Sequence, residues 1–287
     1  MKDSIHFCLD SISCVQETEL VNDPRVHLLR LTGRLDDKEW YDGDVSLEET
    51  VAMIKKAGKL PMTSQPPLGN LVELFTELSQ QGKKIIFITV SSGLSGTYQT
   101  AAMAAKQVMQ EVKGADIRVY DSKSGGLICT DATRLLLAKV EEGCEDMEEL
   151  EAYVKDILSR TLTYYCVETL EHLRLGGRIN KAGALIGGLL GIRPLLSLDE
   201  DGKVIPVDKF RTRKKLLKGI MDTVGSQGDL EYISVMGALC DEDVAYVGEE
   251  MQKRFPNAKV ECCKLGSVLL IHLGAGVLGL FARKRKD

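Results

Sequence analysis

In the first half of the chain, short apolar runs alternate with longer segments whose apolar residues recur at helical spacing. The apolar runs predict strands at residues 5–9, 26–31, 84–90 and 117–120. The helical spacing predicts helices at residues 47–57, 68–81, 97–112, 125–142 and 147–159. Ser46 followed by Glu49 is typical of a capping box at the first of these helices. Strands that alternate with helices in this way predict a parallel sheet covered on both faces.

The second half of the chain has a different pattern, which combines helices with a hairpin. Further strands are predicted at residues 162–167, 195–198, 203–208, 233–237, 259–263 and 268–272, with helices at 213–224 and 244–255. The turn at Asp201-Gly202 favours a hairpin, so we expect a mixed sheet. We therefore predict an α/β protein with an N-terminal parallel-sheet, three-layer domain at residues 1–160 and a C-terminal mixed-sheet domain at residues 161–287. A C-terminal helix could pack back on the first domain.

Composition excludes several classes of protein. The 287 residues carry a formal net charge of -5, which gives no support for nucleic-acid binding. The eight cysteines form no CxxC pair, and the four histidines show no metal-ligand spacing, so we expect neither a metal nor a cofactor. The N-terminus lacks the apolar core of a signal peptide, and the longest apolar stretch, residues 182–192, is too short to span a bilayer. We expect a cytoplasmic protein.

The most informative stretch is the hydroxyl- and glycine-rich loop at residues 91–98, which contains Ser92, Gly93, Ser95 and Gly96. It follows a predicted strand and precedes a predicted helix, so the free N–H groups of the helix start could bind an anion. The loop contains no lysine, arginine or acidic residue. It could therefore hold an anion only through neutral donors.

A second hydroxyl cluster, Thr63-Ser64, lies just before another predicted helix. Taken alone, it is typical of a helix cap. Ligands of open α/β sheets bind beyond the carboxyl ends of the strands, so two such clusters at one sheet edge could instead converge on one ligand.

Three long motifs, in this order, resemble those of the DegV family. They are Pro-Met-Thr-Ser-Gln-Pro at residues 61–66, Ser-Ser-Gly-Leu-Ser-Gly-Thr-Tyr at 91–98 and Leu-Glu-His-Leu-Arg-Leu-Gly-Gly-Arg-Ile at 170–179. Shorter matches are Asp10-Ser11, Tyr41-Asp42-Gly43, Asp121-Ser122 and residues 272–276. The chain departs from the family pattern at Ala275, where proline is usual, and at residues 11–14. The resemblance covers residues 5–280.

The resemblance implies a lipid-binding carrier of lipid metabolism with no turnover of its own. A long-chain fatty acid would lie in an apolar tunnel, with its carboxylate between the two domains. A separate ATP-dependent kinase would then phosphorylate the presented carboxylate to an acyl phosphate. Carried over from the family motifs, Thr63 and Ser95 would bind the carboxylate directly, with Ser64 and Ser92 nearby. Arg178 and His272 would steady the head group, next to Gly274.

Other readings of the same residues stay open. Ser95, His272 and Asp121 could form the triad of a serine-dependent acyl hydrolase. A sugar or ketone-phosphate binding protein is a more distant alternative. Residues 274–279 match G-x-G-x-x-G, but the acidic residue expected about 20 positions further on is missing, so a close-packed helix start is favoured over a dinucleotide site. The basic run at residues 210–218 is either a solvated helix face or a docking surface for a partner.

Overall fold

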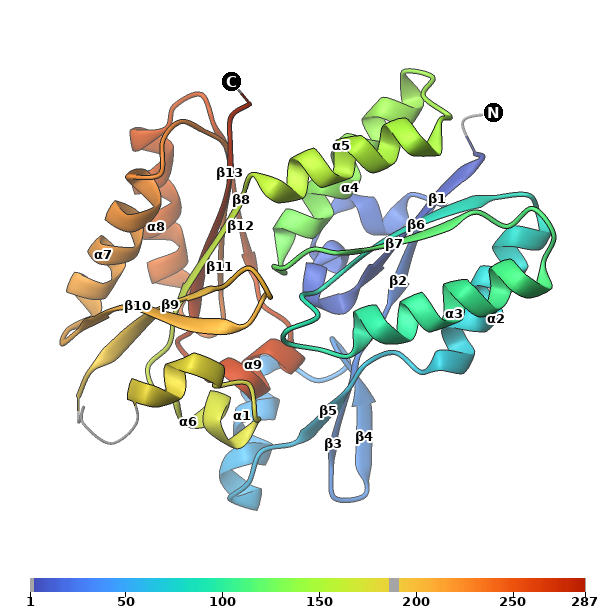
Figure 1. Ribbon diagram of the computed structural model, residues 1–287. Helices are drawn as coiled ribbons and strands as arrows, with labels where there is room; N and C mark the ends of the chain where they lie inside the picture. Colours follow the sequence, from blue (N-terminus) through green and yellow to red (C-terminus); the bar gives the residue numbers. More distant parts are fainter. Residues whose placement is uncertain (1–2, 186–190, 287) are drawn as a thin grey trace. The chain divides into compact units, whose positions relative to one another are not determined.

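The computed structural model describes residues 3–185 and 191–286 (Figure 1). They divide into two compact units. The first unit comprises the residues up to Thr32 together with Ser64–Ser159, and the second comprises Gly33–Thr63 and the residues from Arg160 onward. Residues 186–190, in the apolar stretch at 182–192, lie outside the described part of the chain.

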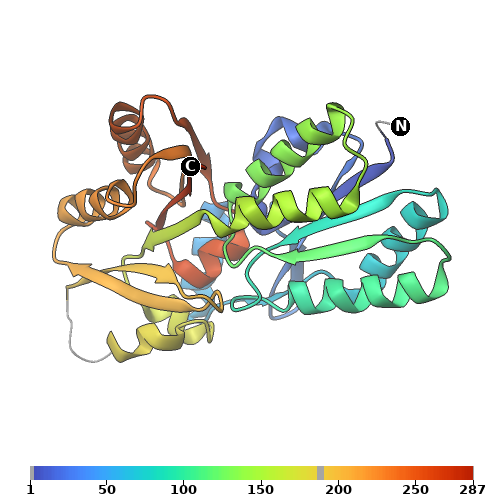
Figure 2. The ribbon, with the colours of Figure 1, turned by 45° about the horizontal axis from the view of Figure 1, so that its top comes forward.

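The first unit is built on a four-stranded parallel sheet in the order β2-β1-β6-β7. Its strands are β1 (Ile5–Asp10), β2 (Val26–Leu29), β6 (Lys84–Thr89) and β7 (Ile117–Asp121). Its helices are α2 (Leu68–Gln80), α3 (Thr97–Glu111), α4 (Leu127–Glu141) and α5 (Met147–Ser159). Figure 2 shows α2 and α3 on one side of the sheet and α4 and α5 on the other. The predicted parallel sheet with two covered faces is therefore confirmed.

The core of this unit explains why its elements were predictable. Phe75 of α2 and Phe87 of β6 are fully buried and meet edge to face, with ring centroids 6.4 Å apart. On α3, the buried residues Ala101, Ala104 and Val108 recur at helical spacing and pack into the same cluster. After β1, the chain forms three short 3-10 helices, η1 (Ser11–Ser13), η2 (Val15–Glu17) and η3 (Glu19–Asn22).

The second unit contains a six-stranded mixed sheet in the order β10-β9-β8-β13-β11-β12. Its strands are β8 (Thr161–Cys166), β9 (Arg193–Leu198), β10 (Val204–Phe210), β11 (Leu230–Gly237), β12 (Lys259–Lys264) and β13 (Leu278–Lys284). Only the β11–β12 pair is parallel among these described strands. Helices α7 (Arg213–Gly225) and α8 (Asp241–Arg254) pack against the sheet through one apolar cluster. The predicted mixed sheet is confirmed, and its β9–β10 hairpin turns at Gly202, whose φ of +71° suits glycine.

Residues 33–63 differ from the predicted division, which placed them in the domain at residues 1–160. They form β3 (Thr32–Leu35), β4 (Lys38–Tyr41), α1 (Leu47–Ala57) and β5 (Met62–Ser64). They belong to the second unit because Trp40 and Val45 are buried against Ile271. The buried Asp42 carboxylate also accepts hydrogen bonds from the Ser267 hydroxyl at 2.9 Å and the Val268 N–H at 3.1 Å.

Two predictions near the C-terminus are wrong. Residues 268–272 lie in a helix, α9 (Ser267–Leu273), because Asp42 satisfies its first-turn N–H at Val268. The expected C-terminal helix is instead strand β13, which runs between β8 and β11 inside the second sheet. The glycine motif at residues 274–279 therefore leads from a helix into a strand, and it opens no helix as a dinucleotide fingerprint would.

Candidate functional site

The serine loop follows β6 at the carboxyl edge of the parallel sheet, and two carboxylates hold it there. Asp10 Oδ2, at the end of β1, accepts the Val90 N–H at 2.6 Å. Asp121 Oδ1, at the end of β7, accepts the Ser92 N–H at 3.0 Å. Burial acts to raise the pKa of Asp121, but hydrogen bonds led by those from Ser92 hold that pKa below its ordinary value. Both acids thus shape the loop before any ligand binds.

Inside the loop, Ser91 accepts hydrogen bonds from three backbone N–H groups. Its hydroxyl accepts the Gly93 N–H at 3.1 Å, and its carbonyl accepts the N–H groups of Leu94 at 3.0 Å and Ser95 at 3.1 Å. The N–H groups from Ser92 to Ser95 are therefore satisfied within the protein. These four groups precede α3, and at the helix start itself Ser95 Oγ accepts the Thr97 N–H.

The side-chain hydroxyls of the loop are further candidate donors. Ser95 Oγ accepts the Thr97 N–H at 3.3 Å and shares a 2.9 Å hydrogen bond with Thr97 Oγ1. With the buried Thr97 hydroxyl as donor in that pair, the Ser95 proton is available for an outside acceptor. Ser92 is half-buried, and its hydroxyl hydrogen-bonds to the Asp121 carboxylate. Of these two serines, Ser95 is therefore the one whose hydroxyl proton is available to a ligand.

The chain just after Thr63 lies against the start of α3. The Gln65 side-chain amide donates to Thr100 Oγ1 at 3.2 Å. A Cβ atom at position 96 would sit 3.1 Å from that same amide, which explains why glycine suits Gly96. Within the first unit, the exposed Ser64 is therefore next in sequence to a residue that touches the serine loop.

In the second unit, Thr63 meets His272. Thr63 Oγ1 lies 2.8 Å from His272 Nε2, although the two residues are 209 positions apart. Thr63 belongs to β5, and His272 belongs to α9, whose first turn is held by Asp42. Asp42 thus positions the helix that carries His272, a role that the sequence did not reveal.

His272 is held as a neutral imidazole. Burial, together with the charge of Arg178 and the proximity of His172, lowers the pKa of His272 to about 4. Its Nδ1 atom is buried and has no hydrogen-bond partner in the described part of the chain. A buried lone pair is cheaper to leave unpaired than a buried N–H, so the Nε2–H tautomer is favoured. His272 then donates to Thr63, whose own O–H proton is free to donate to a ligand.

Close backbone packing fixes this geometry. A Cβ atom on Gly176 would lie 2.5 Å from His272 Nδ1, so only glycine fits there. The Gly176 carbonyl accepts a hydrogen bond from Arg178 Nη1 at 2.6 Å. Gly274 ends α9 with φ of +83°, and a Cβ there would lie 3.1 Å from the His172 ring. The second unit therefore gathers Thr63 and His272, with the charge of Arg178 acting on His272.

The hydrogen bonds of the residues proposed for a hydrolase triad are not those of a triad. A triad needs an acid that accepts from the histidine nitrogen opposite the serine. His272 Nδ1 has no such partner among the residues that the structure describes, and Nε2 is bound to Thr63. The Asp121 carboxylate accepts from Ser92 and Lys123 in its own unit. This geometry does not favour the hydrolase.

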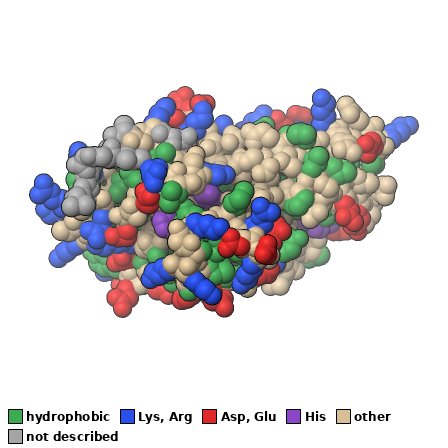
Figure 3. Space-filling model, turned by 90° about the horizontal axis from the view of Figure 1, so that it is seen from below, with side chains coloured by type: hydrophobic (Ala, Val, Ile, Leu, Met, Phe, Trp, Pro, Cys, Tyr) green, Lys and Arg blue, Asp and Glu red, His purple; other side chains and the backbone are tan. Residues whose placement is uncertain are grey.

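The described residues give little support for a metal site, a membrane-spanning helix or a nucleic-acid site. The described histidines, cysteines and acids form no group that could hold a metal ion, and none of the described helices is both long and apolar enough to cross a bilayer. In the basic run, Arg213 forms ion pairs with Glu168 at 3.2 Å and Asp243 at 2.7 Å, both within its own unit. Charged side chains of both signs are intermixed on the face in Figure 3, where a nucleic-acid site would favour one sign.

The fold and these residues define an α/β protein of two units, with hydroxyl donors at a sheet edge and a threonine oriented by a neutral histidine. The chain belongs to the DegV family. The family model described as "Uncharacterised protein, DegV family" matches residues 4–285, which confirms the resemblance drawn from the motifs. Protein DegV of Bacillus subtilis is 33% identical over 234 residues, which cover 79% of this chain and 80% of the relative.

Two solved structures of DegV family proteins are similar in fold to this chain. The crystal structure of DegV, a fatty acid binding protein from Bacillus subtilis, is similar with a TM-score of 0.84 and 29% identity, and covers 98% of this chain and 99% of that one. A DegV family protein from Eubacterium eligens, loaded with heptadecanoic acid, has the same fold, with a TM-score of 0.85, 21% identity and coverage of 98% and 100%. The description of the B. subtilis structure names fatty-acid binding, in agreement with the expectation of a lipid-binding protein.

Proposed function

We propose that this protein binds a long-chain fatty acid and presents its carboxylate to another protein. The observation that carries the proposal is the Thr63–His272 hydrogen bond, which leaves a threonine proton free, in a chain whose B. subtilis relative is a fatty acid binding protein. In this proposal Thr63 and Ser95 donate to the carboxylate, and Ser64 and Ser92 assist them.

The remaining proposed residues act on the head group indirectly. Arg178 supplies positive charge without requiring a tight ion pair, while Gly274 lets α9 end close to His172. Gly93 and Gly96 give the serine loop its path, because the Gly93 N–H closes the turn on Ser91 and Gly96 leaves room for a neighbouring amide.

The acyl chain provides most of the affinity. Burying the methylenes of a C16 acid at about 0.8 kcal/mol each gives about 11 kcal/mol before the costs of association. A hydrogen bond to a charged group adds only about 1.5–3 kcal/mol. In our proposal the tail therefore sets the affinity and the hydroxyls set the orientation of the head group.

We further propose that a separate ATP-dependent kinase transfers the γ-phosphoryl group of ATP to a carboxylate oxygen, giving an acyl phosphate and ADP. Neutral hydroxyl donors would leave an oxygen free for this transfer. A docking role for the basic run now concerns the exposed Arg211 and Lys214, since Arg213 is held internally. The eight free cysteines suit a reducing compartment such as the cytoplasm, where we place this reaction.

Binding of palmitate and of hexadecanol, measured by calorimetry, tests the carboxylate. We expect the wild-type protein to prefer the acid, and Thr63→Val with Ser95→Ala to remove that preference while hexadecanol binding persists. Equal preference in the wild type and the double variant would refute the assignment. Incubation with a long-chain ester tests the hydrolase alternative, since only a hydrolase would release free acid.

The kinase step has its own test. Acyl phosphate can be trapped with hydroxylamine in the presence of ATP and a candidate kinase. Charge reversal at Arg211 and Lys214 should raise the apparent KM of that kinase for the loaded protein without changing palmitate affinity. An unchanged KM would count against docking on this helix.

A further inference from the structure

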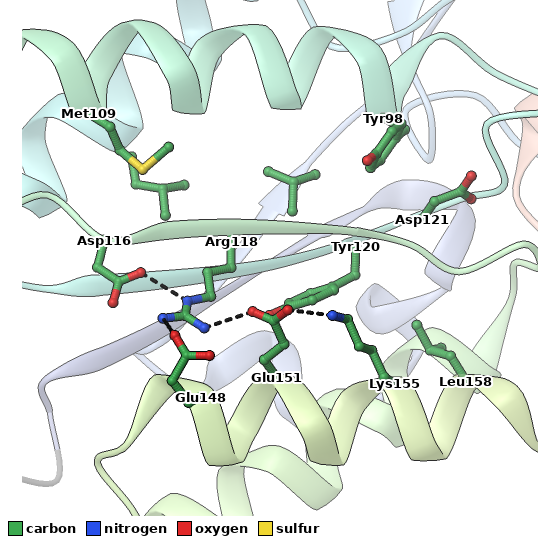
Figure 4. Close-up of a pocket in the computed structure, with 12 residues that line it drawn as sticks. Tyr98, Met109, Asp116, Arg118, Tyr120, Asp121, Glu148, Glu151, Lys155 and Leu158 are labelled. Carbon is green, nitrogen blue, oxygen red and sulfur yellow. Dashed lines mark hydrogen bonds and ion pairs between the residues drawn. The ribbon is translucent and has the colours of Figure 1, made fainter.

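The first unit has a groove of about 810 Å³ along the outer edge of β7. Figure 4 shows α3 on one side of β7 and α5 on the other, with side chains of both helices directed towards the strand. Strand β7 is the last strand of its sheet, and among the described residues no strand pairs with its outer side. None of the hydroxyls assigned to the fatty acid lines this groove, although its lining includes Asp121, which accepts the Ser92 N–H.

Half of the backbone polar groups of β7 face this groove. The Ile85 N–H donates to the Asp116 carbonyl, and the Ser122 N–H donates to the Thr89 carbonyl, so even-numbered residues turn towards β6. Successive residues of a strand alternate, and the odd-numbered ones therefore turn their N–H and C=O groups outward. An open row of this kind is a template for a further strand.

The two walls of the groove differ in chemistry. The α3 wall is largely apolar and presents Tyr98 and Met109, of which Met109 is 43% exposed. The α5 wall presents Glu148 and Glu151 at helical spacing, followed by Lys155. A strand added to β7 would thus meet apolar side chains on one face and carboxylates on the other.

The groove also carries an excess of negative charge. Its lining includes four carboxylates and two cationic side chains, and one of the carboxylates, Asp121, is also paired with Lys123 at 2.9 Å, which leaves one negative charge in excess. One of the cations, Arg118, is already bound by three acids, namely Asp116 at 3.1 Å, Glu148 at 2.8 Å and Glu151 at 2.7 Å. The guanidinium is drawn towards α5, so it does not cap the open edge (Figure 4).

We propose that β7 accepts an extended segment of a partner protein as a fifth strand, and that this segment alternates basic and apolar residues. The basic side chains face Glu148 and Glu151, and the apolar ones face Tyr98 and Met109. The open backbone row contributes affinity, and the two walls contribute specificity. A second copy of this chain is disfavoured, because two acidic grooves would be brought together.

A fluorescent seven-residue peptide that alternates valine and lysine tests this, with anisotropy as the readout. Two N-methylated forms, one methylated at the valines and one at the lysines, separate edge pairing from simple charge attraction. An added strand directs only alternate amides towards β7, so one form should lose about tenfold or more in affinity and the other should bind nearly as well. Valine methylation blocks an antiparallel strand, and lysine methylation blocks a parallel one.

Two protein variants test whether the negative charge of α5 contributes to peptide binding. Glu148→Lys should weaken peptide binding about threefold to tenfold. Glu48→Lys is the matched control, since Glu48 is also the second residue of a helix and is exposed, and it should leave binding within about twofold. Equal losses for both methylated peptides, or for both protein variants, would overturn the proposal. So would a protein that is a dimer by itself and is dissociated by the peptide, because the occupant would then be a second copy.

Discussion

Lowering the pH from 7 to 5 should destabilise the second unit through His272. Its pKa is about 4 in the folded protein, against an ordinary value of 6.5. The unfolded chain therefore binds a proton more readily, so stability is full above about pH 6.5 and is lost as the pH falls towards 4. At pH 5 this loss amounts to about 2 kcal/mol, and it levels off near 3 kcal/mol below about pH 4.

Urea unfolding followed by tryptophan fluorescence measures this loss of stability in the second unit. Trp40 is the single tryptophan, and it is buried against Ile271 in the same unit as His272. For the wild-type protein, the free energy of unfolding should fall between pH 7 and pH 5. In His272→Gln the fall should be smaller by about 2 kcal/mol, because glutamine does not titrate.

A control and a direct titration complete this test. His27→Gln lies in the first unit and should leave the pH dependence of the Trp40 signal unchanged. An NMR titration of the four histidines should find the His272 resonance with a pKa well below 6.5. The same pH dependence in the wild type and His272→Gln, or a His272 pKa at or above 6.5, would refute the neutral imidazole.

Three further predictions concern the residues around His272. Thr63→Val should weaken palmitate binding about tenfold to a hundredfold in calorimetry, while Thr63→Ser, which keeps the hydroxyl, should bind nearly normally. Asp42→Ala should lower the unfolding free energy reported by tryptophan fluorescence by about 1–3 kcal/mol, because the α9 N–H loses its acceptor; an unchanged midpoint would contradict this. Gly176→Ala should displace His272 and reduce palmitate affinity, whereas Gly69→Ala, where a Cβ meets open space, should not.

The parallel sheet and its helices could be predicted because each element is long enough to show its period. The capping box at Ser46 and Glu49 is present, and α1 begins where it predicts. Strands β3, β4 and β5 were missed because runs of three or four residues give no recognisable alternation. The four apolar positions at 268–271 suit a strand or a helix equally, and the hydrogen bond from Val268 to Asp42, more than 200 residues away, favours the helix.

The candidate site was only partly accessible from the sequence. The motifs pointed to Thr63 and His272, but their hydrogen bond joins residues 209 positions apart, and no local pattern encodes it. The importance of Gly176 also depends on a tertiary contact, since its missing side chain makes room for the imidazole. In the serine loop, the Ser91 and Ser95 side chains accept the N–H groups of Gly93 and Thr97, and the sequence pattern did not indicate these bonds.

Native mass spectrometry of the full chain, purified without added lipid and then mixed with a series of fatty acids, tests the central claim most directly. We predict one long-chain acid of about C14 to C18 per chain, either already bound or taken up on mixing, and displaced by a second acid of similar length. A protein that carries no lipid and takes up neither palmitate nor oleate would contradict the account, as would one that retains a phosphorylated sugar in place of the acid.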